Sequence, residues 1–427
     1  MAKAIRVGVL GVGRGAHLGA VAEKVGMELV ALCDSVEPKL EQARRRLGGE
    51  RIATYTDYTR FLEHDLDAVI VANYATEHVP AVLQALAAGK HVMSECLAML
   101  TMAEAVQLVE AVEASGRVYF FAENVPFNVQ CQEMARLYSS GAMGDFLYGE
   151  AEYIHPGTPQ SSATLISGPD HWRAWMPTTY YCTHSMGPVM MVTQTRPVRV
   201  NGFVVPYDFK DPMKTGSISR KDMAGILMCT MDTQALVKVM PCATLRDHGY
   251  RIRFCCNRGT MEYNQGEPRL RVHHEPFDVG PSQPPNRLYM PEFPEAFKAA
   301  ASTGHGGADF FCCHYFAKAI REGSEPLIDV YKAIDMTSVG ILGYRSALQG
   351  GVPIEVPDFR DREVRERYRH DDWSPDPRQR RPGMPWPSVL GDIPIAPESL
   401  QSFAELRRRH EAGFSTPPAP PAPPPAR

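Results

Sequence analysis

The sequence lacks two features that would place the protein at a membrane or on a nucleic acid. It has no run of about 18 apolar residues, so we expect no membrane-spanning helix. Its formal net charge of −4 leaves no excess of positive charge for a polyanion, so we expect no nucleic-acid partner. The best candidate for a local basic patch, residues 378–381, lies in a proline-rich stretch and is expected to be a solvated loop.

A signal peptide and a disulfide framework are also missing. The N-terminus runs directly into a β-branched stretch at residues 5–10, which leaves no room for a signal peptide, so a cytoplasmic location is expected. The 10 cysteines lack the spacing of a small disulfide scaffold. The pairs Cys255-Cys256 and Cys312-Cys313 are adjacent rather than Cys-x-x-Cys, so we expect structural cysteines and no metal site.

The first 122 residues alternate short apolar runs with helical stretches. Strands are expected at residues 5–10, 29–33, 67–72, 91–93 and 118–122. Helices are expected at residues 78–88 and 101–115, each stopped by a glycine. This alternation predicts βαβ units, and therefore an α/β domain with a doubly wound parallel sheet over residues 1–122.

From residue 123 to residue 356 the strand candidates cluster, which predicts a second, α+β domain with a large, mostly antiparallel sheet. The strands are expected at residues 146–154, 198–205, 225–232, 235–241, 250–257 and 259–263. Helices at residues 130–140 and 309–322 would cover this sheet, and a helix at 330–348 is expected to close the globular part. Residues 357–427 form a charged, proline-rich extension, and its end at 417–425 is expected to be disordered polyproline II.

A glycine turn after the first strand indicates a dinucleotide site of the Rossmann type. Residues 11–16 read G-V-G-R-G-A and fit G-x-G-x-x-G/A, in which Gly11 permits the tight turn and Gly13 admits the pyrophosphate. Asp34 ends the next strand, where it can bind both ribose hydroxyls and repel a 2′-phosphate, so we expect NAD rather than NADP. Arg14 would contact phosphate or adenine, or be a solvated arginine at the helix start.

Two further strings give the chain a resemblance to the glucose–fructose oxidoreductase / inositol dehydrogenase / MocA superfamily, over roughly residues 4–356. Residues 72–78 read A-N-Y-A-T-E-H where that superfamily has A-T-P-N-x-x-H beneath the cofactor, which implies that Asn73 and His78 lie beside it. Residues 94–98 read S-E-C-L-A where ordinary members have Glu-Lys-Pro. The resemblance places Glu95 at the nicotinamide-side ribose, whereas Cys96 replaces the lysine that assists proton transfer.

One branch of that superfamily lacks this lysine: the NAD-dependent glycosidases typified by bacterial α-N-acetylgalactosaminidase. Four strings resemble that branch, and they contribute Asn124, Glu150, Tyr181 with His184, and His305. They read E-N at residues 123–124, Y-G-E-A-E-Y-I-H at 148–155, Y-C-T-H-S-M-G-P at 181–188, and G-H-G-G-A-D at 304–309.

The resemblance implies a redox-elimination route for hydrolysis. NAD+ takes a hydride from C3 of the sugar, a base removes the acidified C2 proton, the aglycone leaves C1, water adds, and the hydride returns. We assign His184 to the oxidised hydroxyl, Tyr181 to the C2 proton or the enolate, and Glu150 to hydroxyl binding or proton relay. His305 would line the site or only form a turn, and Trp172 and Tyr180 would stack on the sugar or be buried in the core.

Three functions therefore stay open. The leading hypothesis is an NAD-dependent glycosidase acting on a small sugar or glycoside. The first alternative is an NAD-dependent sugar or polyol dehydrogenase, and the second is a non-catalytic nucleotide sensor. An exposed face of the second sheet would favour a homodimer or homotetramer.

Overall fold

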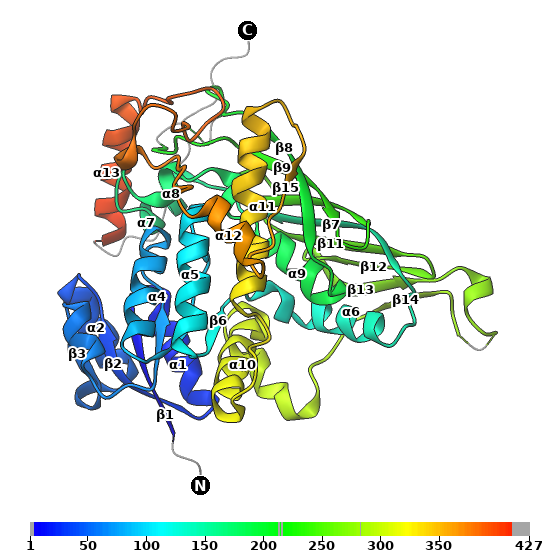
Figure 1. Cartoon of the computed structure of the whole chain (residues 1–427), viewed down its shortest axis with the longest axis horizontal. Helices are drawn as coiled ribbons and strands as arrows, with labels where there is room; N and C mark the ends of the chain where they lie inside the picture. Colours follow the sequence, from blue (N-terminus) through cyan, green and yellow to red (C-terminus); the bar gives the residue numbers. More distant parts are fainter. Residues whose placement is uncertain (1–3, 212–213, 215–216, 282, 412–427) are drawn as a thin grey trace.

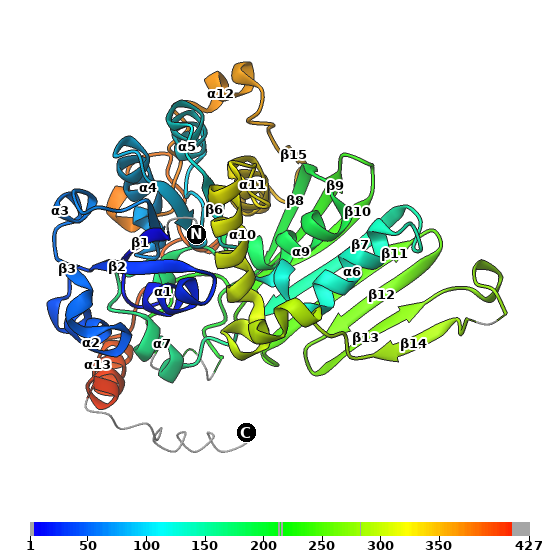
Figure 2. The ribbon, with the colours of Figure 1, turned by 90° about the horizontal axis from the view of Figure 1, so that it is seen from below.

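The structure is a computed structural model that describes residues 4–211, 214, 217–281 and 283–411. Two sheets lie side by side, each with its own helices, and one large hydrophobic core runs through both (Figures 1 and 2). The stretch expected to be disordered, residues 417–425, lies outside the described residues. Within the described part, every helix is too short or too polar to cross a membrane.

The first sheet is parallel, as the alternation of strands and helices predicts, and it has six strands, of which β3 was not predicted. Its order is β3 (Ala53–Tyr55), β2 (Met27–Cys33), β1 (Ile5–Leu10), β4 (Ala68–Val71), β5 (His91–Ser94) and β6 (Tyr119–Phe121). The chain moves outward from β1 to β3 in one direction and from β4 to β6 in the other. The crevice at the carboxyl ends of β1 and β4 is therefore the topological switch point, where such sheets bind their ligands.

The helices of this domain are α1 (Gly15–Lys24), α2 (Glu37–Leu47), α3 (Tyr58–Leu62), α4 (His78–Ala87) and α5 (Met102–Ser115). Two of them, α3 and α5, begin at a side chain that caps them. Before α5, the Thr101 hydroxyl accepts from the backbone of Glu104, and the Glu104 carboxylate accepts from that of Thr101, which forms a capping box. Gly116 then ends the helix in the left-handed conformation, as expected for a C-terminal glycine.

The second sheet has nine strands and is mostly antiparallel, which confirms the expected fold class. Its order is β14 (Asn286–Tyr289), β13 (Glu267–His273), β12 (Gly259–Asn264), β11 (Gly249–Cys256), β7 (Phe146–Ile154), β10 (Leu236–Ala243), β9 (Ala224–Met231), β8 (Pro197–Val205) and β15 (Ile354–Glu355). Only β7 and β10 pair in parallel among the described strands. The strands β13, β14 and β15 were not predicted from the sequence.

Helices cover one face of this sheet, and no helix of the described part crosses the other (Figure 1). The covering helices are α6 (Val129–Ser139), α9 (Thr183–Thr193) and α11 (Val330–Leu348). The expectation that residues 309–322 cover this sheet is wrong, because α10 (Ala308–Glu322) packs mainly against α1 of the first domain. The helix α11 rests directly on β8, because a Cβ built on Gly202 would lie 1.9 Å from the carbonyl oxygen of Gly343. Glycine at this crossing brings the two backbones together.

The globular part does not end with α11, which corrects the expectation from the sequence. Beyond it, α12 (Arg362–Tyr368) and α13 (Pro397–Glu411) pack back onto the protein (Figure 1). Arg365 is 3% exposed and forms a bidentate ion pair with Glu113, and Phe403 of α13 is buried against α7 (Pro159–Leu165). The charges that suggested a solvated extension are thus paired with the core domain.

Candidate active site

The glycine turn forms a cradle with room for a phosphate group. Gly11 has φ +87°, and a Cβ at this position would lie 2.5 Å from the carbonyl oxygen of Ala72, so the tight turn requires glycine. A Cβ on Gly13 would meet nothing within 4 Å, which leaves open space above the turn. Within the described part of the chain, the backbone N–H groups of Gly13 and Arg14 have no hydrogen-bond partner. Free N–H groups before a helix N-terminus are suited to bind phosphate.

Two polar side chains flank the cradle. One carboxylate oxygen of Asp34 accepts from the backbone N–H of Val12 at 2.9 Å, and the other accepts from Val36 at 2.9 Å, so the side chain is fixed beside the turn. The side-chain oxygen of Asn73, just after β4, is buried and accepts no hydrogen bond in the described part. Free N–H groups, a fixed carboxylate and an unsatisfied amide at one crevice fit a dinucleotide with an unphosphorylated ribose.

Arg14 does not point toward a phosphate but links the two domains. Its guanidinium pairs with Glu95 at 3.0 Å and, in a bidentate manner, with Asp309 at 2.8 and 2.5 Å. Asn124 donates to Asp309 at 3.3 Å, and Nδ1 of His305 lies 3.0 Å from it. Burial would raise the pKa of Asp309, but His305 and Arg14 hold that pKa far below its usual range. The site therefore has a charged, pre-ordered wall at its cofactor end.

A cavity of about 470 Å³ opens between the two domains at this wall. Several of the predicted residues line it, namely Arg14, Glu95, Asn124, Tyr181, His184 and His305. The sheet contributes Tyr153, His155, Thr244 and Tyr250 to the opposite side. The structure thus brings Tyr181, just before α9, and His184, within α9, to the same cavity as Arg14 and Glu95 at the cofactor site.

His184 is held by a buried glutamate that the sequence interpretation gave no role. Nδ1 of His184 lies 2.8 and 2.9 Å from the two carboxylate oxygens of Glu123, which has no solvent exposure. Burial alone would raise the pKa of Glu123, but the adjacent His184 keeps that pKa below its usual range, so the carboxylate is ionised. With Nδ1–H donated to Glu123, His184 presents Nε2 to the cavity as a base.

Two aromatic rings orient the same imidazole. Tyr153 and Tyr181 each contact His184 edge to face, with ring centroids 5.1 and 4.9 Å away. Trp172, 7% exposed, stacks against Tyr181 from behind at 6.2 Å. The imidazole is therefore fixed by packing on two sides and by an ion pair on a third.

Cys96 lies at the position where ordinary members of the resembled superfamily have a lysine. Like His184, it contacts Glu123. Its thiol donates to Glu123 at 3.3 Å, and burial raises the pKa of this thiol well above its usual value, so it stays protonated. Donor atoms of Cys96, Glu123 and His184 all lie within 4.8 Å of one another, the composition of a metal site. Because two of the three point hydrogens at the third, the group is arranged as a hydrogen-bond relay.

Three predicted residues lie behind the cavity instead of lining it. His78 is 1% exposed, with Nδ1 2.8 Å from the carbonyl oxygen of Leu97 and Nε2 3.3 Å from that of Asn73. It therefore braces the crevice and is not in position to touch the cofactor. Tyr180 is fully buried against Tyr344, and Trp172 supports Tyr181, so for both the core-burial alternative describes the structure.

Glu150 lies on the other face of the second sheet. Along β7, Gly149, Ala151 and Tyr153 point toward the helices and the cavity, so Glu150 between them points away. There it accepts from the Tyr148 hydroxyl at 2.8 Å and pairs with Lys238 at 3.4 Å. The structure thus separates Glu150 from His184 and Tyr181.

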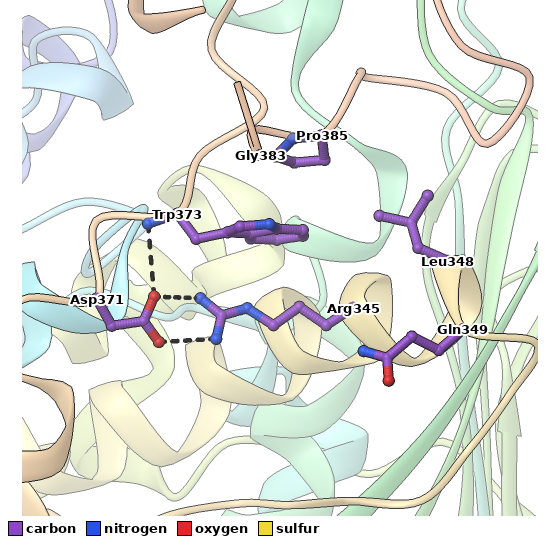
Figure 3. Close-up of a pocket in the computed structure, with 7 residues that line it drawn as sticks. All are labelled: Arg345, Leu348, Gln349, Asp371, Trp373, Gly383 and Pro385. Carbon is purple, nitrogen blue, oxygen red and sulfur yellow. Dashed lines mark hydrogen bonds and ion pairs between the residues drawn. The ribbon is translucent and has the colours of Figure 1, made fainter. Parts of the chain in front are cut away.

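A second hollow, of about 370 Å³, lies apart from this site (Figure 3). Its charged lining residues in the described part, Arg345 and Asp371, are bonded to each other. Its arginine, Arg345, is bonded through both nitrogens to Asp371 at 2.5 and 2.7 Å, beneath the ring of Trp373. These contacts fasten the segment after α12 to the end of α11. The two hollows are similar in volume, but only the first is lined by the predicted catalytic residues Tyr181 and His184.

Comparison with known proteins defines the class. Residues 5–123 match the family model described as "Oxidoreductase family, NAD-binding Rossmann fold", and residues 288–365 match "Glycosyl hydrolase 109, C-terminal domain". The resemblance predicted from the sequence is therefore confirmed in both segments, as is an enzyme with NAD as its cofactor.

Individual proteins that the chain resembles are glycosyl hydrolases by sequence and oxidoreductases by structure. A "Glycosyl hydrolase family 109 protein 1" of Shewanella sp. (strain MR-7) is 25% identical over 399 residues, covering 83% of this chain and 85% of the relative. An "Alpha-N-acetylgalactosaminidase" of Shewanella oneidensis is 24% identical over 393 residues, with the same coverage. Among solved structures, an oxidoreductase domain protein from Kribbella flavida superposes with a TM-score of 0.71 at 20% identity, covering 83% of this chain and 100% of that one.

A levoglucosan dehydrogenase in complex with NADH and levoglucosan also superposes with a TM-score of 0.71, at 19% identity and over the same shares of the two chains. At an identity of 19–20%, the likeness to these solved structures is evidence for the fold alone. Taken with the site, the comparisons support an NAD-dependent glycosidase or sugar oxidoreductase.

Proposed function

We propose that the protein is an NAD-dependent glycoside hydrolase that works by transient oxidation at C3, elimination and addition of water. The observation that carries this proposal is the Glu123–His184 pair, which supplies a base at the cavity where Cys96 has replaced a lysine. The similarity to glycosyl hydrolase family 109 proteins over 83% of the chain supports the same choice.

Bound NAD supplies a hydride acceptor and later returns the hydride, so the net reaction is hydrolysis. Free N–H groups at Gly13 and Arg14, with the carboxylate of Asp34, would hold the dinucleotide across the switch point. Glu95 would bind the ribose on the nicotinamide side, since Arg14 keeps its side chain at the cavity wall.

His184 takes the proton from the hydroxyl that is oxidised. Its Nδ1–H is held by Glu123, so Nε2 can accept this proton, and the buried carboxylate stabilises the imidazolium that forms. The same nitrogen can return the proton when the hydroxyl is restored. Glu123 is thus a positioning residue, because it reaches the substrate only through the imidazole.

Tyr181 is the group placed to act at C2. It lines the cavity in edge contact with His184, and the stacked pair of Trp172 and Tyr181 fixes its ring. As a phenolate, Tyr181 can remove the C2 proton and become a phenol; as a phenol, it can donate a hydrogen bond to the developing enolate. Glu150 takes no part in this proposal, because it lies on the opposite face of the sheet.

The alternative is a plain NAD-dependent sugar or polyol dehydrogenase, since the same imidazole would accept a hydroxyl proton in a simple oxidation. Purified protein is incubated in deuterated water with a panel of p-nitrophenyl glycosides, including the α-N-acetylgalactosaminide. The proposal expects release of nitrophenol, deuterium at C2 of the sugar and no net NADH. Stoichiometric NADH from an intact glycoside would identify the dehydrogenase instead.

For the assembly we propose a second copy of the chain on the open face of the nine-stranded sheet. A row of paired residues of alternating charge crosses this face, Arg271, Glu262, Arg253, Glu150 and Lys238. A two-fold axis between Glu262 and Arg253 would place each of them opposite the other's copy and would place Arg271 opposite the copy of Glu150, so that opposite charges meet across the interface. Light scattering should report a dimer or tetramer, and Arg253→Glu should favour the monomer; a monomeric native protein would refute this assembly.

A further inference from the structure

Three cations of the second domain line the cavity. Arg173, Lys214 and Lys221 all reach it, together with the hydroxyl side chains of Ser161, Ser162, Ser217 and Ser219. The single carboxylate among the described lining residues is Glu95, and it is already paired with Arg14. Arg173 and Lys214 therefore bring positive charge to the cavity without a lining carboxylate to pair with it in the described part.

Arg173 is held in a fixed place next to the predicted catalytic tyrosine. It belongs to the short helix α8 (Trp172–Trp175), and its guanidinium lies 4.2 Å from the ring centre of Trp172 and 5.9 Å from that of Tyr181. No residue in the described part accepts a hydrogen bond from this guanidinium. A planar guanidinium with unused donors is suited to a carboxylate, phosphate or sulfate group.

Lys214 is 6% exposed, and its ammonium lies 5.3 Å from the ring centre of Tyr207. The two carboxylates whose fields act on it have other partners: Asp211 is paired with Arg246, and Asp222 accepts from Ser388 and Val389. The ammonium of Lys214 lines the cavity without a hydrogen-bond acceptor in the described part of the chain, and an anionic ligand group would provide one.

We propose that the cavity takes a sugar bearing an oxyanion substituent, a carboxylate, phosphate or sulfate, which Arg173 and Lys214 bind. The substituent belongs to the substrate and not to the cofactor, because these cations come from α8 and the connection between β8 and β9, not from the Rossmann domain. The inference shares with the proposed function only that the ligand is a sugar. It stands whether the reaction is hydrolysis or oxidation.

The test is calorimetric binding to the NAD-loaded protein, so it requires no turnover. The probes are glucose, glucuronate, glucose 6-phosphate and glucose 6-sulfate, with the matching galactose series and inorganic phosphate alone. Charge-assisted hydrogen bonds predict that at least one charged sugar binds about tenfold or more tightly than its neutral parent. The member that binds best identifies the oxyanion, and inorganic phosphate should bind more weakly than a phosphorylated sugar if the sugar contributes contacts.

Variants assign the preference to the two cations. Arg173→Gln and Lys214→Met should each reduce the ratio of charged to neutral affinity at least about threefold. Lys210→Gln removes an exposed charge from the same connection outside the cavity and should leave the ratio unchanged. Unaltered NAD binding serves as the check that each variant is folded.

The proposal is overturned if neutral and charged sugars bind equally, if none of them binds, or if the ratio is unchanged in both variants. A clear anion preference without hydrolysis of any glycoside would retain this inference and refute the hydrolase. Hydrolysis of a glycoside without an anion preference would support the hydrolase and refute this inference.

Discussion

Replacing Glu123 by glutamine removes the buried charge that holds His184 while changing the side-chain volume little. The native carboxylate lies 2.8 Å from Nδ1, has no solvent exposure and is ionised. A hydrogen bond to a charged group contributes about 1.5–3 kcal/mol. If that stabilisation is expressed when the imidazolium forms, kcat/KM should fall about 10- to 150-fold, since about 1.4 kcal/mol corresponds to a factor of ten.

The assay is kcat/KM for a p-nitrophenyl glycoside across a range of pH, with the NAD dissociation constant measured in parallel. NAD affinity should change little, because Glu123 lies behind His184. Glu123→Asp, which keeps the charge, should recover part of the rate.

Cys96→Ser is the matched control, because a serine hydroxyl can still donate to the same carboxylate. It should retain activity within a few-fold of the native protein. A Glu123→Gln enzyme with native kcat/KM would refute the positioning role of Glu123.

Four further predictions concern single residues. Gly13→Ala meets nothing in the apo protein, so its melting temperature should stay native while NAD binding weakens at least about tenfold; native affinity would remove the cradle from the cofactor site. Asp34→Ala should weaken NAD binding and relax discrimination against NADP, and unchanged affinities for both would refute the ribose role. His184→Ala should abolish turnover with NAD binding nearly native, which a single rate measurement can contradict. Since burial lowers the pKa of Lys214 to about 8, with Asp211, Asp222 and Arg246 also acting on it, the preference for charged sugars should decline as pH rises through that value, and a preference constant to well above pH 8 would exclude Lys214.

The fold follows from local signals where those signals are strong. The apolar β-branched runs that became β1 and β4, and the Thr101 cap with its Gly116 stop, specify elements without reference to the rest of the chain. The strand β13 reads E-P-R-L-R-V-H, whose charges and Pro268 hide it from such rules; it becomes a strand through pairing with β12 and β14. The charged extension was read as solvated because the partner of Arg365, Glu113, is distant in sequence.

Some residues of the candidate site could likewise be predicted from local sequence signals, and others could not. Gly11, Gly13 and Asp34 could be found because a turn, a phosphate cradle and a ribose contact each need a particular residue at a fixed spacing. Glu123 had one usable signal, a carboxylate directly after a buried parallel strand, where ligand sites occur. The side of β7 that Glu150 takes depends on which face the helices cover, which one strand does not reveal. Arg173 and Lys214 meet only through tertiary folding.

The most direct measurement of the central claim uses protein stripped of nucleotide and supplied with one equivalent of NAD+. The account predicts that nitrophenol release depends on the added NAD+, continues for many turnovers per cofactor, and leaves no reduced nicotinamide behind. Release without NAD+, or one NADH accumulated for each sugar consumed, would contradict it.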